Sequence, residues 1–237
     1  MVIIQQTLFR FLSIYIGFGI LIAFFLILIF KILRYNRTRT ILTFSGFYIL
    51  VCIALILNFL YASIFDKEIV LILHYITIYF IFFSGIFIVN FCIILLKDVE
   101  KFTLKKQVII TIIYAIVLCI TFLIPNGVII NDDWRPVWNL YYFLYLIILN
   151  FTTGFIPTIY YCIKIFKSLD DNFLRNKWIF FIIGIFCLYI GLYGTCIDNT
   201  LDNPSFRPIW SIFLTIFVII GAYFMYYAVA IKFKPLK

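Results

Sequence analysis

The sequence predicts an all-α integral membrane protein, a bundle of seven transmembrane helices forming a single domain over residues 1–237. Two observations carry this prediction. Hydrophobic residues make up 66% of the chain and charged residues only 12%, which is too little polar surface for a protein folded in water. The apolar residues also run without alternation, as in 21–30 and 109–120, so helices rather than barrel strands must satisfy the backbone in lipid.

Seven apolar runs, each long enough to cross about 30 Å of hydrocarbon, define the expected helices. Their expected ranges are 11–32, 41–65, 69–96, 107–124, 137–163, 178–197 and 209–231. The first run exceeds the apolar stretch of a cleavable signal peptide and its positive cluster follows it, so we expect it to remain as a span. A polar stretch from Asn150 to Pro157 interrupts the fifth run, where the proline should kink the helix and two threonines can repair the hydrogen bonding.

The charge distribution predicts the orientation of the bundle. The connectors after the first, third and fifth runs, with the C-terminal segment, hold most of the 19 basic residues. The other side holds only Arg10, Lys67, Arg135 and Arg207. Because positively charged loops stay in the cytoplasm, we expect an outer N-terminus and a cytoplasmic C-terminus in a multi-pass protein of the cell membrane. The net charge of +9 then reflects topology and attraction to an anionic lipid bilayer, so we expect no nucleic-acid partner.

Two short segments share one pattern, an aromatic residue followed by Arg-Pro, one further residue and Trp. They are residues 134–139 (WRPVWN) and 206–211 (FRPIWS). Each segment precedes a long apolar run, and proline suits the first turn of a helix, where its missing N–H leaves no gap. We therefore expect both segments to begin helices that enter the membrane from the outer face.

These two segments have two structural interpretations, and the third possibility is a chance similarity of short strings. In the first they only anchor helices, with each arginine bound to lipid phosphate or to the acids of the outer loops. In the second they form a binding site, in which Arg135 and Arg207 bind an anionic ligand. Trp138 and Trp210 would then stack on that ligand.

Further polar residues could form a vestibule beneath the two arginines. His74 is the only histidine, and an ionisable residue within a span is a functional candidate. Asn58, Tyr142 and Tyr193 are expected at a similar depth. The alternative is that these side chains only join neighbouring helices. We expect no metal site, no cofactor and no catalytic residues, because the histidine lacks partner ligands and the sequence shows no nucleophile–base set.

The seven-helix arrangement resembles the heptahelical sensor regions that precede histidine kinases in prokaryotes. The WRPVWN and FRPIWS strings are similar to those of uncharacterised archaeal seven-helix proteins. The resemblance implies a sensor-like protein without an output domain, which would signal through a separate cytoplasmic partner at the basic inner loops. We therefore expect a non-catalytic receptor that binds a small ligand, such as an anion, or a lipid headgroup at its outer vestibule.

Two other functions stay open. The first is a small-molecule or lipid transporter without proton coupling, since no Asp or Glu lies in the middle of an expected span. The second is a membrane subunit or scaffold that binds no ligand. A pocket closed toward the cytoplasm would favour a receptor, whereas a cavity reaching the middle of the membrane from both sides would favour transport.

Overall fold

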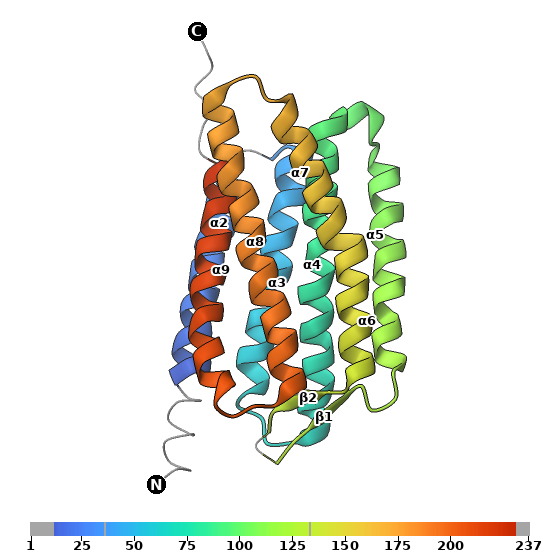
Figure 1. Ribbon diagram of the computed structural model, residues 1–237, viewed down its shortest axis with the longest axis vertical. Helices are drawn as coiled ribbons and strands as arrows, with labels where there is room; N and C mark the ends of the chain where they lie inside the picture. The colour runs from blue at the N-terminus through green and yellow to red at the C-terminus, as the bar shows by residue number, and fades with distance from the viewer. Residues whose placement is uncertain (1–11, 36, 133, 231–237) are drawn as a thin grey trace.

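The computed structural model describes residues 12–35, 37–132 and 134–230. Seven helices in these ranges are long and apolar enough to cross a membrane, and they run side by side along the long axis of the molecule (Figure 1). The predicted seven-helix membrane bundle is therefore confirmed. Residue 11, which begins the first expected span, and residue 231, which ends the seventh, lie outside the described residues.

Four spans are single α-helices, and three include a short π-helix or 3-10 helix. The elements in order are η1 (Leu12–Phe18, a π-helix), α2 (Gly19–Tyr35), α3 (Arg39–Tyr61), α4 (Lys67–Lys101), α5 (Leu104–Cys119), η2 (Ile120–Leu123, a 3-10 helix), β1 (Val128–Ile130), β2 (Pro136–Trp138), α6 (Leu140–Asn150), η3 (Phe151–Phe155, a π-helix), α7 (Ile156–Ser168), α8 (Asn172–Leu201) and α9 (Phe206–Ala230). The fifth span joins α6, η3 and α7 into one stretch, Leu140–Ser168.

Short polar side chains mark where most of the helices begin. In each case a side-chain oxygen accepts a hydrogen bond from a backbone N–H of the first turn, which otherwise has no partner. The capping residues are Thr38, Asp66, Thr103, Asn139 and Asp171. These caps lie in the connectors between the apolar runs, so the sequence itself limits each helix.

The expectation that the first Arg-Pro-x-Trp segment begins a helix is wrong. Pro136–Trp138 forms strand β2, which pairs antiparallel with β1 and places Trp138 opposite Val128. The helix starts only at Leu140, because Oδ1 of Asn139 accepts a hydrogen bond from the N–H of Tyr142 at 2.8 Å and so caps it. The second segment does begin a helix, since α9 starts at Phe206.

The β1–β2 hairpin lies across one end of the bundle, beside the ends of α4, α6 and α8 (Figure 1). We call this end the hairpin end. The opposite end carries the connectors α2–α3, α4–α5 and α7–α8, and we call it the basic end. Its exposed basic side chains are Lys31, Arg34, Arg37, Lys97, Lys105, Lys106, Lys164 and Lys167.

One arginine of the basic end is structural rather than part of this exposed surface. Nε of Arg39 donates to Oε1 of Gln107 at 2.9 Å, and its Nη1 donates to the carbonyl oxygen of Phe102 at 2.7 Å. Nε2 of Gln107 donates in turn to Oγ1 of Thr43 at 3.0 Å. These bonds fix the α4–α5 connector to the start of α3.

The fifth span changes its hydrogen-bonding pattern at the predicted interruption. Helix α6 ends at Asn150, the π-helix η3 follows, and α7 continues with Pro157 in its first turn. The hydroxyl groups of Thr152 and Thr153 donate to backbone carbonyl oxygens one turn earlier, at 2.7 and 2.6 Å. The threonines thus satisfy carbonyl groups where the regular helix is broken.

An aromatic cluster fills the bundle toward the basic end. Its members are Phe44, Tyr48, Phe91, Trp178 and Phe181. The ring centroids of Phe44 and Phe91 lie 4.8 Å apart, and those of Trp178 and Phe181 lie 4.4 Å apart. The polar atoms of the cluster are also paired, since Tyr48 donates to the carbonyl oxygen of Ala222 and Trp178 to that of Cys162. This part of the bundle is therefore closed by tightly packed rings.

Helices α8 and α9 approach each other closely because small residues face each other across their interface. A Cβ atom added to Gly184 would lie 2.6 Å from the carbonyl oxygen of Gly221, and one added to Gly221 would lie 2.8 Å from that of Gly184. Gly194 likewise leaves room for the indole ring of Trp210, which occupies the place of a Cβ atom. Glycine at these positions sets the distance between the two helices.

Gly184→Ala should lower the free energy of unfolding by about 2 kcal/mol, because the added methyl group meets backbone that can move only if the two helices separate. Gly19→Ala is the matched control. Nothing lies within 4 Å of a Cβ atom added to Gly19, and alanine favours a helix, so this change should be neutral or stabilising. Thermal unfolding of the detergent-solubilised protein measures both variants. Equal stability of the two would contradict the close packing of α8 on α9.

Candidate functional site

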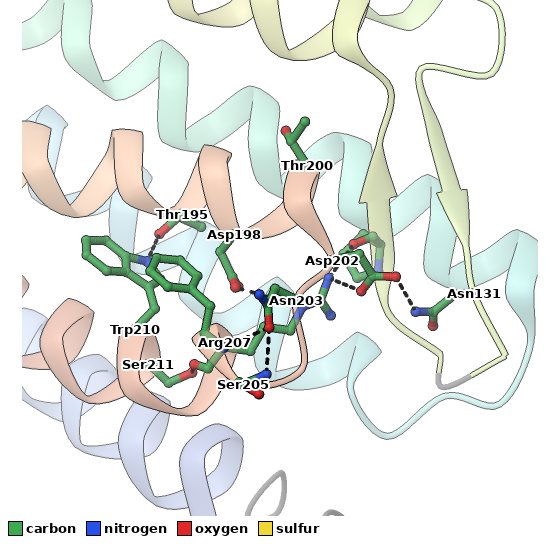
Figure 2. Close-up of polar contacts among 12 residues, drawn as sticks. Asn131, Thr195, Asp198, Thr200, Asp202, Asn203, Ser205, Arg207, Trp210 and Ser211 are labelled. Atoms are coloured by element: carbon green, nitrogen blue, oxygen red, sulfur yellow. Dashed lines mark hydrogen bonds and ion pairs between the residues drawn. The ribbon is translucent and has the colours of Figure 1, made fainter.

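Arg207 lies at the hairpin end within a network of polar groups from α8, α9 and the hairpin (Figure 2). Its Nη2 lies 2.8 Å from Oδ1 of Asp202, and its Nε lies 3.9 Å from Oδ1 of Asp198. The residue is only 9% exposed. Two acids at the end of α8 thus neutralise a nearly buried guanidinium. This arrangement matches the anchoring interpretation, in which the arginine binds acids of the protein itself.

The same network ties the hairpin to the bundle. Nη2 of Arg207 also donates to the carbonyl oxygen of Pro136 in β2, at 3.5 Å. Nδ2 of Asn131, next to β1, donates to Oδ2 of Asp202 at 3.4 Å. A second ion pair joins Nζ of Lys67 on α4 to Oδ1 of Asp132 at 2.9 Å. The hydrogen bond from Lys67 and its positive charge hold the pKa of Asp132 below its usual value.

Arg135 is placed differently from Arg207. Its backbone N–H donates to Oδ1 of Asn131 at 3.0 Å, which closes the hairpin loop. Its guanidinium makes no hydrogen bond or ion pair with any residue in the described ranges, although its charge acts on Asp198. The charges of both arginines therefore act on Asp198, and of the two only Arg207 forms ion pairs with described residues.

The two tryptophans of the repeated segments contact different parts of the bundle. Trp210 lies on Gly194, and its Nε1 donates to Oγ1 of Thr195 at 3.3 Å (Figure 2). Its indole stacks on the ring of Phe206 with the centroids 5.9 Å apart. Trp138 instead points from β2 toward α4. The tryptophans consequently support two separate helix contacts rather than a shared stacking platform.

Trp138, His74 and Tyr61 form a buried hydrogen-bonded chain that joins the hairpin to α4 and α3. Nε1 of Trp138 lies 2.9 Å from Nε2 of His74, and the hydroxyl oxygen of Tyr61 lies 3.2 Å from Nδ1. Because an indole N–H can only donate, Nε2 must accept and carry no proton. His74 is therefore neutral with its proton on Nδ1, which donates to Tyr61. His74 is 2% and Trp138 3% exposed, so this chain is shielded from solvent.

Tyr142 packs beside this chain without joining it. Its ring lies edge-on to Trp138, with the centroids 5.0 Å apart, and to Tyr75 at 5.7 Å. The residue is fully buried, and its hydroxyl has no hydrogen-bond partner in the part of the chain that the structure describes. Such an unpaired hydroxyl is destabilising unless another molecule pairs with it.

A cavity of about 180 Å³ extends through the bundle from this chain toward the basic end. Its wall is formed by residues of η1, α2, α3, α4, α8 and α9, together with Asn150 of α6 and Trp138 of the hairpin. Apolar side chains dominate the wall, and no charged side chain of the described residues contributes to it. The cavity therefore suits an apolar molecule far better than an ion.

The cavity ends toward the basic end at the aromatic cluster. Phe47, Ile88 and Ile185 line the part of the cavity nearest to the basic end. One helical turn closer to the basic end, the cluster residues Phe44, Phe91 and Phe181 follow them on the same three helices, and each is at most 1% exposed. The rings thus close the cavity on that side.

The structure brings together part of the predicted site. Trp138, His74 and Tyr142 lie in one buried group, and Asn58 and Trp138 both line the cavity. Arg207, Trp210 and Tyr193 are used within the protein, the last through a hydrogen bond from its hydroxyl to Oδ1 of Asn150 at 3.1 Å.

Tyr61 of the hydrogen-bonded chain and most residues of the cavity wall, Thr195 and Cys196 among them, lay outside the predicted site. Tyr61 is an aromatic hydroxyl at the hairpin end of α3, and its position there could have suggested a partner for His74. Thr195 and Cys196 line the cavity from α8. Their position next to the glycine-rich face of α8 could have indicated that these two residues face the inside of the bundle.

Comparison with known proteins finds no family model and no curated protein that matches the chain. The fold defines a multi-pass membrane protein with an apolar cavity beneath a polar cap of one hairpin.

Proposed function

We propose that this protein is a receptor-like, non-catalytic membrane protein that binds a small molecule in the bundle cavity and signals through a separate partner at the basic end. One observation carries the proposal. The cavity lies next to the hairpin, and the aromatic cluster closes it toward the basic end. A ligand can therefore lodge in the bundle without a path to the basic end, as a receptor requires.

The orientation belongs to this proposal. The exposed lysines and arginines of the basic end favour a cytoplasmic location for that end in the cell membrane. The hairpin end, whose Arg207 is neutralised by Asp198 and Asp202, would face outward. The same basic surface would attract an anionic leaflet and could bind an acidic partner.

The cavity also connects the helices that such a signal would need. Its wall includes residues of α3, α4 and α8, and these helices run on to the basic end, where they carry the aromatic cluster. A ligand that moved one of these helices would move the packed rings with it, since close-packed cores shift between discrete arrangements.

Cysteine labelling tests whether the cavity ever opens toward the basic end. Ile88→Cys, made with Cys119→Ser to remove an exposed thiol, places a reactive group at that end of the cavity. A membrane-impermeant maleimide is then applied to right-side-out and inside-out vesicles. A receptor should leave residue 88 unlabelled from both sides.

Lys105→Cys is the matched control, because Lys105 is exposed at the basic end. Its labelling should occur only in inside-out vesicles. Rapid labelling of residue 88 from the same side would contradict the proposal and favour a carrier. Labelling of residue 105 from outside would reverse the proposed orientation.

A further inference from the structure

We propose that the cavity binds an uncharged amphipathic molecule, namely an elongated hydrocarbon body that carries one hydroxyl or carbonyl group. Its polar group would lie at Asn58, and its body would extend along the bundle toward Met225. This inference rests on the proposed function, because it names the ligand of the same cavity. It replaces the anionic ligand that the arginine residues suggested.

The charge of the wall excludes an ionic ligand. No Asp, Glu, Lys, Arg or His side chain of the described residues lines the cavity. A carboxylate or an ammonium group placed there would lose its hydration and gain no opposite charge, which is costly in a medium of low dielectric constant. Arg207 cannot supply that charge, because it is paired with Asp202 and Asp198.

Asn58 provides the polar contact that an uncharged ligand needs. Its side chain lines the cavity from α3 and makes no hydrogen bond with any described residue. An amide offers both donors and an acceptor, so it can pair with a hydroxyl or with a carbonyl group. Within a membrane an unpaired amide is unfavourable, and a ligand that satisfies it gains affinity and a fixed orientation.

Other polar groups of the wall already have partners in the protein. Ser84 donates to the carbonyl oxygen of Ile81 at 2.6 Å. Thr195 donates to the carbonyl oxygen of Gly191 at 2.8 Å and accepts from Trp210. Near the hairpin end of the cavity, Asn58 is therefore a polar side chain that has no hydrogen-bond partner among the described residues.

The shape of the cavity indicates an elongated body. On α3 the wall runs from Asn58 to Phe47, and on α9 it runs from Leu214 to Met225. Each stretch corresponds to about 16 Å along a helix. An engineered apolar cavity of about 150 Å³ binds benzene, so a cavity of about 180 Å³ accepts a somewhat larger hydrocarbon.

The experiment uses three photoreactive probes of equal chain length, each with a diazirine on the hydrocarbon tail. One probe ends in a hydroxyl group, one in a carboxylate and one in a methyl group. The full chain is reconstituted in phosphatidylcholine nanodiscs, and mass spectrometry measures saturable labelling of residues 214–225. We expect the alcohol to label at concentrations at least about tenfold lower than either of the others.

Asn58→Leu tests the polar contact directly. This variant should raise the half-saturating concentration of the alcohol about tenfold, to that of the methyl-terminated probe, and leave the latter unchanged. The methyl-terminated probe thereby reports that the variant still folds and keeps its cavity. An unchanged preference for the alcohol would overturn the assignment of Asn58.

Val218→Phe tests the position of the hydrocarbon body, because Val218 lines the cavity and a phenyl ring would fill it. Ile216→Phe is the matched control on the same helix, since Ile216 is 47% exposed on the outer surface. Only the first variant should lose saturable labelling. Loss in both, or in neither, would contradict binding inside the bundle.

Two further results separate the ligand class from the proposed function. If the carboxylate, or a phospholipid with the same diazirine in its acyl chain, labels as tightly as the alcohol, the ligand class is wrong. Hydrogen–deuterium exchange of residues 164–177 at the basic end then reports on signalling. Specific alcohol binding without any change in exchange would retain this inference and contradict the receptor function.

Discussion

Arg207→Ala should lower the free energy of unfolding by about 3 kcal/mol and release the hairpin from the bundle. The change leaves Asp198 and Asp202 without their cation, and the uncompensated charges rather than the lost attraction dominate the cost. The expected loss lies at the lower end of the range for buried ion pairs, because the side chain of Asp202 is 38% exposed. The substitution also removes the hydrogen bond from Arg207 to the carbonyl oxygen of Pro136.

Arg135→Ala is the matched control for this prediction. It removes an equal charge from the same end of the bundle, but its guanidinium has no ion pair in the described part of the chain. We expect it to change stability by less than about 0.5 kcal/mol. Urea unfolding in detergent, followed by tryptophan fluorescence, measures both variants. Similar losses would show that the network around Arg207 does not anchor the hairpin.

The seven spans could be predicted from the sequence because the membrane imposes simple requirements. Each span needs a long apolar run, and each connector carries the charges and caps, such as Thr38 and Asp171. The interruption at Pro157 was also visible, since a proline and two threonines stand out in an apolar run. These features are local and depend on composition more than on packing.

The start of the fifth span could not be predicted in the same way. Proline occurs both in the first turn of a helix and in a short edge strand, so the Arg-Pro-x-Trp pattern fits either structure. The deciding residues were Asn139, which caps α6, and Val128, which pairs with Trp138. Strand pairing of this kind depends on a contact between separate segments, and periodicity does not reveal it.

The cavity was not predictable from the sequence for a different reason. A lipid-facing residue such as Ile216 and a cavity-lining residue such as Val218 are both aliphatic, and only packing distinguishes them. The aromatic cluster that closes the cavity was hidden among the many phenylalanines for the same reason. In a membrane protein, hydrophobicity identifies what lies in the bilayer but not what lies inside the bundle.

The acids that pair with Arg207 favour the anchoring interpretation of its Arg-Pro-x-Trp segment over the binding-site interpretation. The sequence placed two arginines near several outer acids and could not say which would pair. Folding brings Asp198 and Asp202 to the end of α8, one turn apart, where both reach Arg207. Arg135 has the same sequence context but lies in the hairpin loop, where that pairing does not form. The repeated segments therefore have unequal roles.

Trp138→Phe and His74→Leu should each lower the free energy of unfolding by about 2 kcal/mol, because each leaves a buried polar nitrogen unpaired. The double variant removes both nitrogens, so it should lose about 2–3 kcal/mol rather than the sum of the two. The difference is a coupling energy of about 1–2 kcal/mol, near the upper limit for hydrogen bonds measured within membranes. Denaturant unfolding of the three variants and the parent protein completes this cycle.

The same cycle tests whether the hairpin caps the cavity. Since Trp138 both lines the cavity and bonds to His74, loosening this contact should free the hairpin and expose the hairpin end of the cavity. Cys196, which is 1% exposed and lines that end, is the natural reporter. In a Cys119→Ser background, a water-soluble maleimide should label Cys196 faster in either single variant than in the parent. Additive stability losses with unchanged labelling would mean that Trp138 and His74 act independently and that other contacts, such as those of Arg207 and Lys67, hold the hairpin.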